Sequence, residues 1–432
     1  MNRMPEQLDV AVIGAGLAGL RAATDLLAAG RDVAVFEARN RVGGRVWSHR
    51  FPNGQWCERG AEFIDANHTA VLALAQSLGL GLLDATKGRD DAKRLLDVGG
   101  RPAPFTLHHS LQTELAWWHE AQAKLAAFVD PDDPTASEHA ADLDLLPLSE
   151  YVTALHLSVA TRVAVGRELR TEFMVGPDGV SQLMAAWMFA RHLQAGDGHE
   201  AFRIDGGNDQ LASGLAAALG DRIRLGAAVA DIDASGAIIM ADGERAMARQ
   251  IVAAVPLPVL SRIWPVLPDE LAAVGYGVGG KVSVQTDRRI WQDYGRDGAV
   301  LTDRAWGEMW DTSEHQPGDG GVLTALLSSN DGAALAALPD TVERVIDEAD
   351  RLFPGFKGMS RDAVRTDWTH DPFSLGAYAT FGPGQLRDAW PKLRERYGRI
   401  VLAGEHTDAY CGFMEGALRS GARVARDLLA GR

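Results

Sequence analysis

The stretch Asp9–Arg45, DVAVIGAGLAGLRAATDLLAAGRDVAVFEARNRVGGR, decides the fold of this 432-residue chain. It opens with an apolar strand over residues 10–13, turns through a run of glycines, and continues as an amphipathic helix that stops at Gly30. A second apolar strand covers residues 32–36 and is followed by Glu37. Strand, glycine turn, helix and second strand in this order predict a βαβ unit with a dinucleotide-binding fingerprint.

The residue types of the fingerprint suit the contacts that a dinucleotide needs. Gly14 permits the tight turn, Gly16 lets the backbone approach a pyrophosphate, and Gly19 lets the helix lie close to the strand. The N–H groups and positive dipole at the start of the helix favour the phosphates. Glu37 can accept hydrogen bonds from both ribose hydroxyls, and its charge would repel a 2′-phosphate.

The residues after the second strand indicate which dinucleotide is bound. Gly43 and Gly44 let the backbone pass close to a flat ring system, and Arg45 suits the pyrophosphate charge. The string EARNRVGGR, which includes Arg39, resembles the FAD signature of the flavin amine oxidases. That resemblance implies a bound FAD held by these residues. The alternative is an ordinary NAD-type domain followed by a basic loop.

Composition indicates a soluble globular enzyme, with 46% hydrophobic and 23% charged residues. The net charge of −15 argues against nucleic acid or an anionic membrane as a partner. Cys57 and Cys411 have neither metal-site spacing nor a disulfide framework, which is consistent with a reducing compartment. The leader over residues 1–9 is too short and polar for a signal peptide, and no apolar run could span a bilayer. We expect a cytoplasmic protein without a metal site. A homodimer is one of the assemblies that we expect for it.

The order of the elements predicts an α/β fold with two interleaved domains. A Rossmann-type (GR2-like) FAD-binding domain is expected from residues 1–69, 201–265 and 376–432. A discontinuous substrate domain of mixed β-sheet plus helices is expected from residues 70–200 and 266–375. Apolar spacing predicts that the segment 70–200 is a mostly helical insertion, with helical patterns over 69–80, 87–129 and 148–193.

A glutamate near the first domain boundary is a candidate active-site acid. In the resembling family, a glycine-rich segment that matches residues 57–64 lies along the flavin edge, which places Glu62 there. A solvated loop carboxylate is the equal alternative. The L-amino-acid oxidases of the family carry a substrate-clamping Arg in this segment, and here the matching position is Phe63, which disfavours a free amino acid. Glu62 is also the single carboxylate that the sequence offers for a polyamine tunnel.

Of two glycine-rich turns in the middle of the chain, we interpret one as part of the FAD site and reject the other as a nucleotide site. The Gly206–Gly207 turn, with its following helix and strands, resembles the second FAD segment of the family and implies that Val229 contacts the adenine. The run Gly275–Gly280 is a literal GxGxxG, but a helical pattern precedes it and an alternating strand follows, so we reject a second nucleotide site. With no place for NAD(P)H, electrons must reach the flavin from the substrate.

Lys281 follows this glycine run at the start of a strand. In the resembling family a lysine in this position holds a water against the flavin N5 and assists reoxidation by O2. The alternative is a lysine on a surface strand.

The C-terminal segments extend the resemblance. Trp368 opens a WTHDPFSLGAY segment similar to one in the family, in which a Cys attaches the flavin covalently in the monoamine oxidases; Ala377 stands there, which predicts noncovalent FAD. Tyr378 and Phe413 match the two walls of the family's aromatic cage, which steers an amine nitrogen. Glu405 is the expected ribityl or phosphate-side contact, and a helix that begins near Met414 would stabilise negative charge on the reduced flavin.

The resemblance implies an FAD-dependent amine oxidase. Hydride transfer from the C–N carbon of a small primary or secondary amine to N5 would give an imine, and O2 would become hydrogen peroxide. Four alternatives remain: a biosynthetic oxidase whose imine is used in C–C bond formation, a carotenoid- or porphyrinogen-type desaturase, an L-amino-acid oxidase, and a scaffold protein with structural FAD. The Lys281 motif and the Tyr378–Phe413 pair argue against the desaturase.

Overall fold

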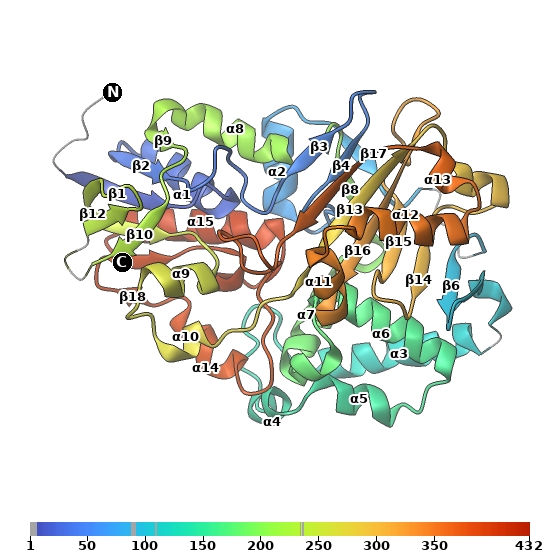
Figure 1. The fold of residues 1–432 in the computed structure, drawn as a ribbon. Helices are drawn as coiled ribbons and strands as arrows, with labels where there is room; N and C mark the ends of the chain where they lie inside the picture. Colours follow the sequence, from blue (N-terminus) through green and yellow to red (C-terminus); the bar gives the residue numbers. More distant parts are fainter. Residues whose placement is uncertain (1–6, 88–91, 109, 234, 236) are drawn as a thin grey trace.

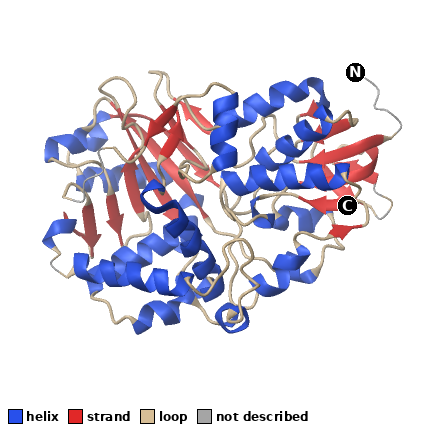
Figure 2. Cartoon of the chain, turned by 180° about the vertical axis from the view of Figure 1, so that it is seen from behind, coloured by secondary structure: helices blue, strands red, loops and turns tan. Residues whose placement is uncertain are grey.

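The computed structural model describes residues 7–87, 92–108, 110–233, 235 and 237–432. The first six residues of the leader and five residues of the expected 87–129 helix (88–91 and 109) lie outside the described part. Two β-sheets form the two halves of an elongated molecule, and helices pack around each of them (Figure 1). The view from behind shows the same two sheets, one in each half of the molecule (Figure 2).

The first sheet contains the fingerprint. Its eight strands are β1 (Leu8–Ile13), β2 (Val33–Phe36), β9 (Ile223–Arg224), β10 (Val229–Ile232), β11 (Ala237–Met240), β12 (Arg245–Ala253), β18 (Arg396–Tyr397) and β19 (Ile400–Leu402). The central strands β9, β2, β1, β12 and β19 run parallel. β1 and β2 are buried almost throughout, as expected for strands that are covered on both faces.

Two helices at opposite ends of the sequence cover the fingerprint strand. α1 (Leu17–Ala28) packs against α15 (Met414–Leu429) and α8 (Asp209–Leu219). A Cβ at Gly19 would lie 2.0 Å from the carbonyl oxygen of Gly14, so only glycine allows α1 to approach the turn this closely. The expected βαβ unit is therefore present, with its helix seated on the sheet.

The second sheet is mixed. Its strands, in spatial order, are β17 (Ser360–Asp367), β13 (Gly279–Thr286), β16 (Gly321–Ser328), β15 (Glu308–Asp311), β14 (Val300–Thr302), β6 (Leu95–Val98) and β7 (Arg101–Pro104). Only β14 and β6 pair in parallel. β13 is antiparallel to both of its neighbours, so the Gly275–Gly280 run enters an antiparallel strand and not a βαβ unit.

Helices cover this half of the molecule on the side opposite α11 and α12. They are α3 (Leu111–Ala126), α4 (Ala140–Leu145), α5 (Leu148–Ala154), α6 (Val159–Phe173) and α7 (Gln182–Ala195). α2 (Thr69–Ser77) instead packs against α15, in the half that contains the fingerprint. The remaining helices are α9 (Leu257–Ile263), α10 (Asp269–Ala272), α11 (Ser329–Ala337), α12 (Thr341–Leu352), α13 (Phe356–Met359) and α14 (Leu386–Lys392). α12 buries Thr341, Val345, Ala349 and Leu352, a stripe at helical spacing that faces the core.

Residues 70–200 are mostly helical, as expected, but the helical pattern predicted over 87–129 is wrong in its first part. The segment from Leu82 to Pro104 contains β5 (Leu82–Asp84) and the hairpin of β6 and β7, which turns at Gly99–Gly100. Both glycines have positive φ, as a two-residue hairpin turn requires. Apolar spacing alone did not separate this short hairpin from a helix.

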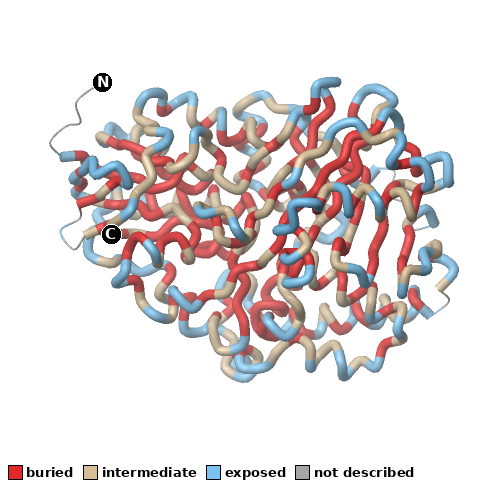
Figure 3. Tube along the Cα trace, in the orientation of Figure 1, coloured by how far each residue is buried: buried red, intermediate tan, exposed pale blue. Residues whose placement is uncertain are grey.

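Two further small sheets consist of two antiparallel strands each. β3 (Ser48–Arg50) pairs with β4 (Trp56–Glu58), and β5 pairs with β8 (Phe202–Ile204). Buried chain runs through both sheets and through the segments between them (Figure 3). Among the described residues, no helix combines the length and apolar character that a membrane crossing needs. The interleaved domain boundaries stay a prediction.

Candidate active site

One cavity of about 610 Å³ extends from the fingerprint to the second sheet. At one end it is lined by the turn after β1, the end of β2 and the segment 43–46. At the other end it is lined by α6, β13, β15 and the N-terminus of α15. Residues from both halves of the molecule therefore share a single chamber.

The fingerprint end is shaped to receive a dinucleotide. Gly14 has φ of +98°, and a Cβ there would lie 2.7 Å from the carbonyl oxygen of Ala254. Gly16 lines the cavity and has no atom within 4 Å of a Cβ position, so a side chain there would project into open space. Gly16 also precedes α1 without any side-chain cap, which leaves the first N–H groups of the helix for an anion.

Glu37 is buried at the end of β2 and lines the same end of the cavity. Its carboxylate accepts hydrogen bonds from the backbone N–H groups of Ala15 and Arg39, both at 2.8 Å. A carboxylate has about four acceptor sites, so capacity remains for hydroxyl groups of a ligand.

Hydrogen bonds and ion pairs join the N-terminal segment to segments more than three hundred residues away, through Arg39 and Arg45 of the fingerprint stretch and through Arg59. Arg39 pairs with Asp371 and donates to Ser374 Oγ at 2.9 Å. Arg45 donates to the carbonyl oxygen of Ala377 and pairs with Glu405 at 3.0 Å. Trp368 Nε1 donates to the carbonyl oxygen of Arg59 at 3.0 Å. Arg39, Arg45 and Trp368 all line the cavity.

Two of the expected cofactor contacts lie outside the cavity lining. Gly19 lies within α1, where it acts through helix packing. Val229 begins β10 and pairs with Met240, while Ala254, Val255 and Pro256 line this end of the cavity. Contact of Val229 with an adenine stays a prediction.

The residues of the fingerprint end fit an FAD. A Cβ at Gly16 would occupy the space that a pyrophosphate needs, and Glu37 presents acceptors where ribose hydroxyls are expected. His406 also lines the cavity, and its buried Nε2 has no hydrogen-bond partner among the described residues. Of the same described residues, no cluster of three or more His, Cys, Asp or Glu could hold a metal ion.

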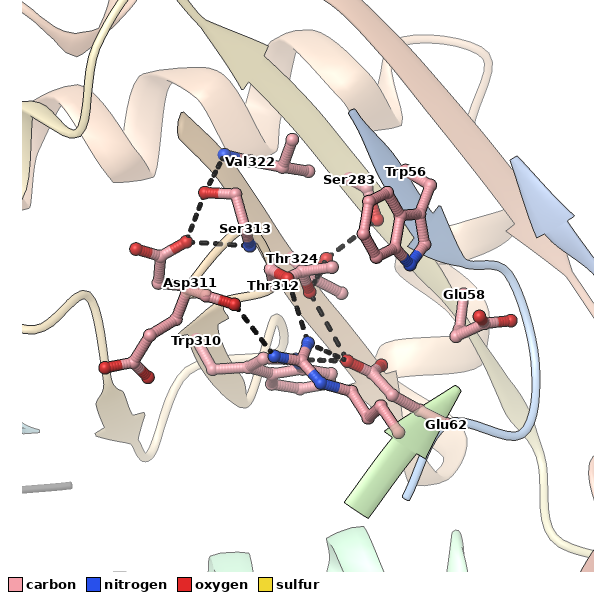
Figure 4. Close-up of polar contacts among 12 residues, drawn as sticks. Trp56, Glu58, Glu62, Ser283, Trp310, Asp311, Thr312, Ser313, Val322 and Thr324 are labelled. Atoms are coloured by element: carbon pink, nitrogen blue, oxygen red, sulfur yellow. Dashed lines mark hydrogen bonds and ion pairs between the residues drawn. The ribbon is translucent and has the colours of Figure 1, made fainter. Parts of the chain in front are cut away.

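Lys281 and Glu62 form a buried ion pair at the border between the sheets. Lys281 Nζ donates to Glu62 Oε2 at 2.7 Å and to the carbonyl oxygen of Gly60 at 3.0 Å. Glu62 Oε1 accepts a hydrogen bond from Trp310 Nε1 at 3.0 Å (Figure 4). The Arg203 guanidinium lies 3.3 Å from the same oxygen. Burial opposes ionisation, but Lys281 and Arg203 hold the pKa of Glu62 below its ordinary value.

The surroundings of Glu62 exclude the solvated-loop alternative, and its role as an active-site acid stays a prediction. The carboxylate is not a solvated loop group, because it is buried and also lies 3.5 Å from the Thr312 hydroxyl, which bonds to Thr324 (Figure 4). Its bonds hold it as an anion. Lys281 has used two of its three N–H groups, so one remains for a water in the cavity.

The two expected cage residues both line the cavity. The Tyr378 hydroxyl donates to the carbonyl oxygens of Thr171 and Glu172, both at 2.9 Å, at the end of α6. Phe413 immediately precedes α15. Gly412, the residue before Phe413, lies against the Tyr378 ring, because a Cβ there would be 3.6 Å from a ring carbon.

The Glu405 carboxylate bonds to three different segments near the cage residues. Few of its acceptor sites are therefore left for a ribityl chain. Its carboxylate accepts from Arg45, from Ala379 N at 3.2 Å and from Gly412 N at 2.9 Å. The start of α15 opens on the cavity at Met414, without a side-chain cap. The expected helix terminus is therefore directed at the chamber.

Acidic residues near the second sheet were missed from the sequence. Glu62 was the single carboxylate expected near a substrate, yet Asp65, Glu172, Glu200, Asp297 and Glu308 also line the cavity. Thr171 donates to Glu308 at 3.0 Å. Burial and the charge of Glu200 raise the pKa of Glu308, although Arg94 and Arg167 oppose the shift. These residues come from separate segments without a shared motif, so only the fold brings them together.

Comparisons with known proteins agree with this geometry. The family model described as flavin containing amine oxidoreductase matches residues 17–429. A Mycobacterium tuberculosis protein named as a flavin-containing monoamine oxidase, AofH, is 30% identical over 99% of this chain and 97% of its own. Putrescine oxidase bound to putrescine superposes with a TM-score of 0.87 and 27% identity over 98% of this chain and 99% of that one. Cyclohexylamine oxidase from Brevibacterium oxydans superposes with a TM-score of 0.85 and 27% identity, over 98% and 100%. This chain belongs to the flavin-containing amine oxidoreductase family and is an FAD-dependent amine oxidase.

Proposed function

We propose that the protein oxidises a C–N bond in a small primary or secondary amine. The observation that carries this proposal is the pair of Tyr378 and Phe413, which line the cavity beside the open N-terminus of α15. Two aromatic faces attract a nitrogen group and exclude water from it. Bound FAD supplies the two-electron acceptor at N5, with an imine as the product and O2 reduced to hydrogen peroxide.

The other residues of the chamber orient the reactants. Tyr378 cannot rotate freely, because its hydroxyl is bonded to two carbonyl groups at the end of α6. Lys281, fixed by Glu62, has one remaining N–H group that would hold a water in the cavity and assist reoxidation of a bound flavin by O2. Ala377 offers no nucleophile, and burial raises the pKa of the Cys411 thiol well above its usual range, which supports noncovalent FAD.

A diamine is a second candidate substrate. The cavity is also lined by Glu200 and Glu308, which are half-buried, and a cation would stabilise two such carboxylates. The structural relative bound to putrescine is consistent with this candidate. We expect Glu308→Gln to raise the KM for a diamine at least about tenfold and to leave the KM for a monoamine of equal length within about twofold. Equal changes for both amines would remove the diamine from consideration.

The test of the main proposal is anaerobic mixing of the FAD-loaded protein with a panel of amines. Bleaching of the visible flavin absorbance by one class of amine, and its recovery in air, are the expected results. If dithionite reduces the flavin but no amine does, the proposal is wrong and the desaturase gains support.

A further inference from the structure

A second, smaller cavity of about 230 Å³ lies between β18, β19 and the C-terminal half of α15, beside the end of the chain (Figure 1). We call it the arginine pocket, because its lining contains Arg394, Arg396, Arg423 and Arg432. The other lining residues are Glu395, Val401, Leu402, Val424 and Asp427. None of these residues lines the larger cavity, so the arginine pocket is separate from the candidate active site.

The arginine pocket carries more positive than negative charge, although the whole chain has a net charge of −15. Its four guanidinium groups are accompanied by the carboxylates of Glu395 and Asp427 and by the main-chain carboxylate of Arg432. Arg432 Nη2 lies 3.6 Å from one oxygen of Asp427, and Arg423 Nη1 lies 4.0 Å from the other. Neither distance is that of a hydrogen bond, so Arg423 has no closely bound carboxylate among the described residues.

Two of the arginines converge on a single residue. Arg394 Nε donates to the main-chain carbonyl oxygen of Thr407 at 3.2 Å, and Arg423 Nη2 donates to Thr407 Oγ1 at 3.0 Å. Thr407 holds the two guanidinium groups close together and offers them no negative charge. Burial and then the charge of Arg394 lower the pKa of Arg423, and the nearby carboxylates do not cancel this shift. The two cations therefore repel each other, and an anion between them would remove the repulsion.

Donor groups of this pair have no partner in the folded chain. Within the part of the chain that the structure describes, Arg394 Nη1 and Nη2 make no hydrogen bond, and Arg423 Nε is buried without one. Native proteins retain few buried polar atoms without a partner. The protein alone thus leaves the hydrogen-bonding capacity of both guanidinium groups partly unused.

The size and chemistry of the pocket suit a phosphate group. Its volume of about 230 Å³ is below the roughly 300–1,000 Å³ of sites for drug-sized ligands, so it fits a small ion. Guanidinium forks match the oxygen atoms of phosphate, which offers acceptors in several directions and carries up to two charges. A carboxylate has only two oxygens and one charge, and would leave one of the two arginines unmatched.

The arginine pocket adjoins a turn that lines the cofactor chamber. Thr407 ends the turn over residues 404–407, and its N–H and its hydroxyl both donate to the carbonyl oxygen of Gly404 at 3.0 Å. The first three residues of this turn line the larger cavity. Whatever fixes the two arginines that bond to Thr407 therefore also fixes one wall of the chamber.

We propose that the arginine pocket binds a phosphate group, and that this binding steadies the turn over residues 404–407 and strengthens the retention of FAD. The Nη groups of Arg394 and Arg423 that have no other partner hold the phosphate oxygens. The bonds of both arginines to Thr407 stay in place, because they use other N–H groups. This inference does not depend on which amine the protein oxidises.

Calorimetric titration of the FAD-loaded protein with inorganic phosphate tests the site. Bound FAD occupies the larger cavity, so its own phosphate cradle is closed to the titrant. At about pH 8, above the second pKa of a phosphate group, we expect saturable binding at one site. Sodium chloride at equal ionic strength, which screens charge without matching the guanidinium forks, should give no such binding.

Variants locate the binding. Arg394→Met and Arg423→Met should each weaken phosphate binding at least about tenfold, as loss of a charged hydrogen-bond partner does. Arg394 is exposed, so Arg394→Met keeps the test valid if the half-buried Arg423 cannot be replaced without unfolding. Arg344→Met removes an exposed arginine of α12 and should leave phosphate binding unchanged. Absence of saturable binding to the wild type, or equal binding to all three variants, would overturn the proposal.

Methyl phosphate distinguishes the two sources of such a group. Binding within about threefold of that of inorganic phosphate would assign the pocket to a phosphate ester, and binding at least about tenfold weaker would assign it to the free ion.

The link to the cofactor is tested by the release of FAD on dilution, followed by fluorescence. Saturating phosphate should slow this release at least about threefold in the wild type and should not change it in Arg394→Met, since two ligands that favour the same state strengthen each other's binding. If phosphate binds and the release of FAD is unaltered, the effect on the cofactor is wrong and only the anion site stands. Neither measurement uses an amine, so failure of the proposed amine oxidation would leave both results intact.

Discussion

At the scale of single residues, the Glu62–Lys281 pair has the largest energetic consequences. Both side chains are at least nine-tenths buried, and they come from opposite sides of the boundary between the halves. Removing one charge of a buried pair leaves the other without compensation, which typically costs about 3–5 kcal/mol. The pair therefore stabilises the fold as well as fixing Lys281 in the cavity.

We expect Glu62→Gln to lower the free energy of unfolding by about 3 kcal/mol at neutral pH. The folded pKa of Glu62 is depressed, so its contribution exists above the unfolded carboxyl value of 4.5 and is lost as the pH falls through the folded value. The stability difference between wild type and variant should therefore shrink below about pH 4.5. Unfolding followed at several pH values tests this, with Glu138→Gln at an exposed site as the control. Equal stability at neutral pH would contradict it.

Lys281→Met should separate the two halves of the catalytic cycle. Without the ammonium group, a water at this point of the cavity wall loses its charged donor, so reoxidation of the reduced flavin by O2 should slow by about 100-fold. Reduction by the amine should change by less than about threefold, since steric positioning governs that step. Stopped-flow measurement of each half-reaction gives both rates. Lys124→Met, at an exposed lysine on α3, is the control, and unaltered reoxidation would return Lys281 to a purely structural role.

At the scale of elements, the seat of α1 on the first sheet depends on Gly19. A Cβ there would meet the Gly14 carbonyl oxygen at 2.0 Å and the Val12 side chain at 3.1 Å. We expect Gly19→Ala to displace α1 and to weaken FAD retention at least about tenfold, because the phosphate site is the helix terminus itself. Flavin release on dilution, followed by fluorescence, measures this.

Gly166→Ala is the matched control for Gly19→Ala. Gly166 is also a helical glycine, in α6, but no atom lies within 4 Å of its Cβ position. The change should keep FAD binding unaltered and raise stability by about 0.5–1 kcal/mol, because alanine loses less conformational entropy in a helix. Equal flavin loss in both variants would show that helix packing at Gly19 is not the cause.

The elements also show where sequence reasoning succeeds. The βαβ unit of residues 8–36 was predictable because period, glycine spacing and the terminal glutamate agree within one short stretch. The hairpin of β6 and β7 was not, because its strands have four residues each and no clear alternation. The contact of His199 with Asp65 was not predictable either, since about 130 residues separate the two and they meet only through tertiary packing.

At the scale of the whole molecule, charge should influence substrate capture. The chain carries a net charge of −15, and its cavity is lined by several carboxylates. A cationic amine should be attracted to the cavity, so kcat/KM should fall severalfold between about 20 and about 300 mM salt, while kcat stays unchanged. Steady-state kinetics test this, and the effect should vanish at a pH where the amine is neutral. An unchanged kcat/KM would show that capture does not depend on long-range attraction.

The packing of α1 against α15 has a consequence for the synthesis of the protein. These helices lie side by side, yet about 390 residues separate them along the chain. Ribosomes add about 5–20 residues per second, so the N-terminal βαβ unit must wait roughly 20–80 s for its last packing partner. During that interval the apolar faces of β1 and α1 lack their final cover and are open to chaperones. Uptake of FAD would then mark the moment at which translation has reached the end of α15.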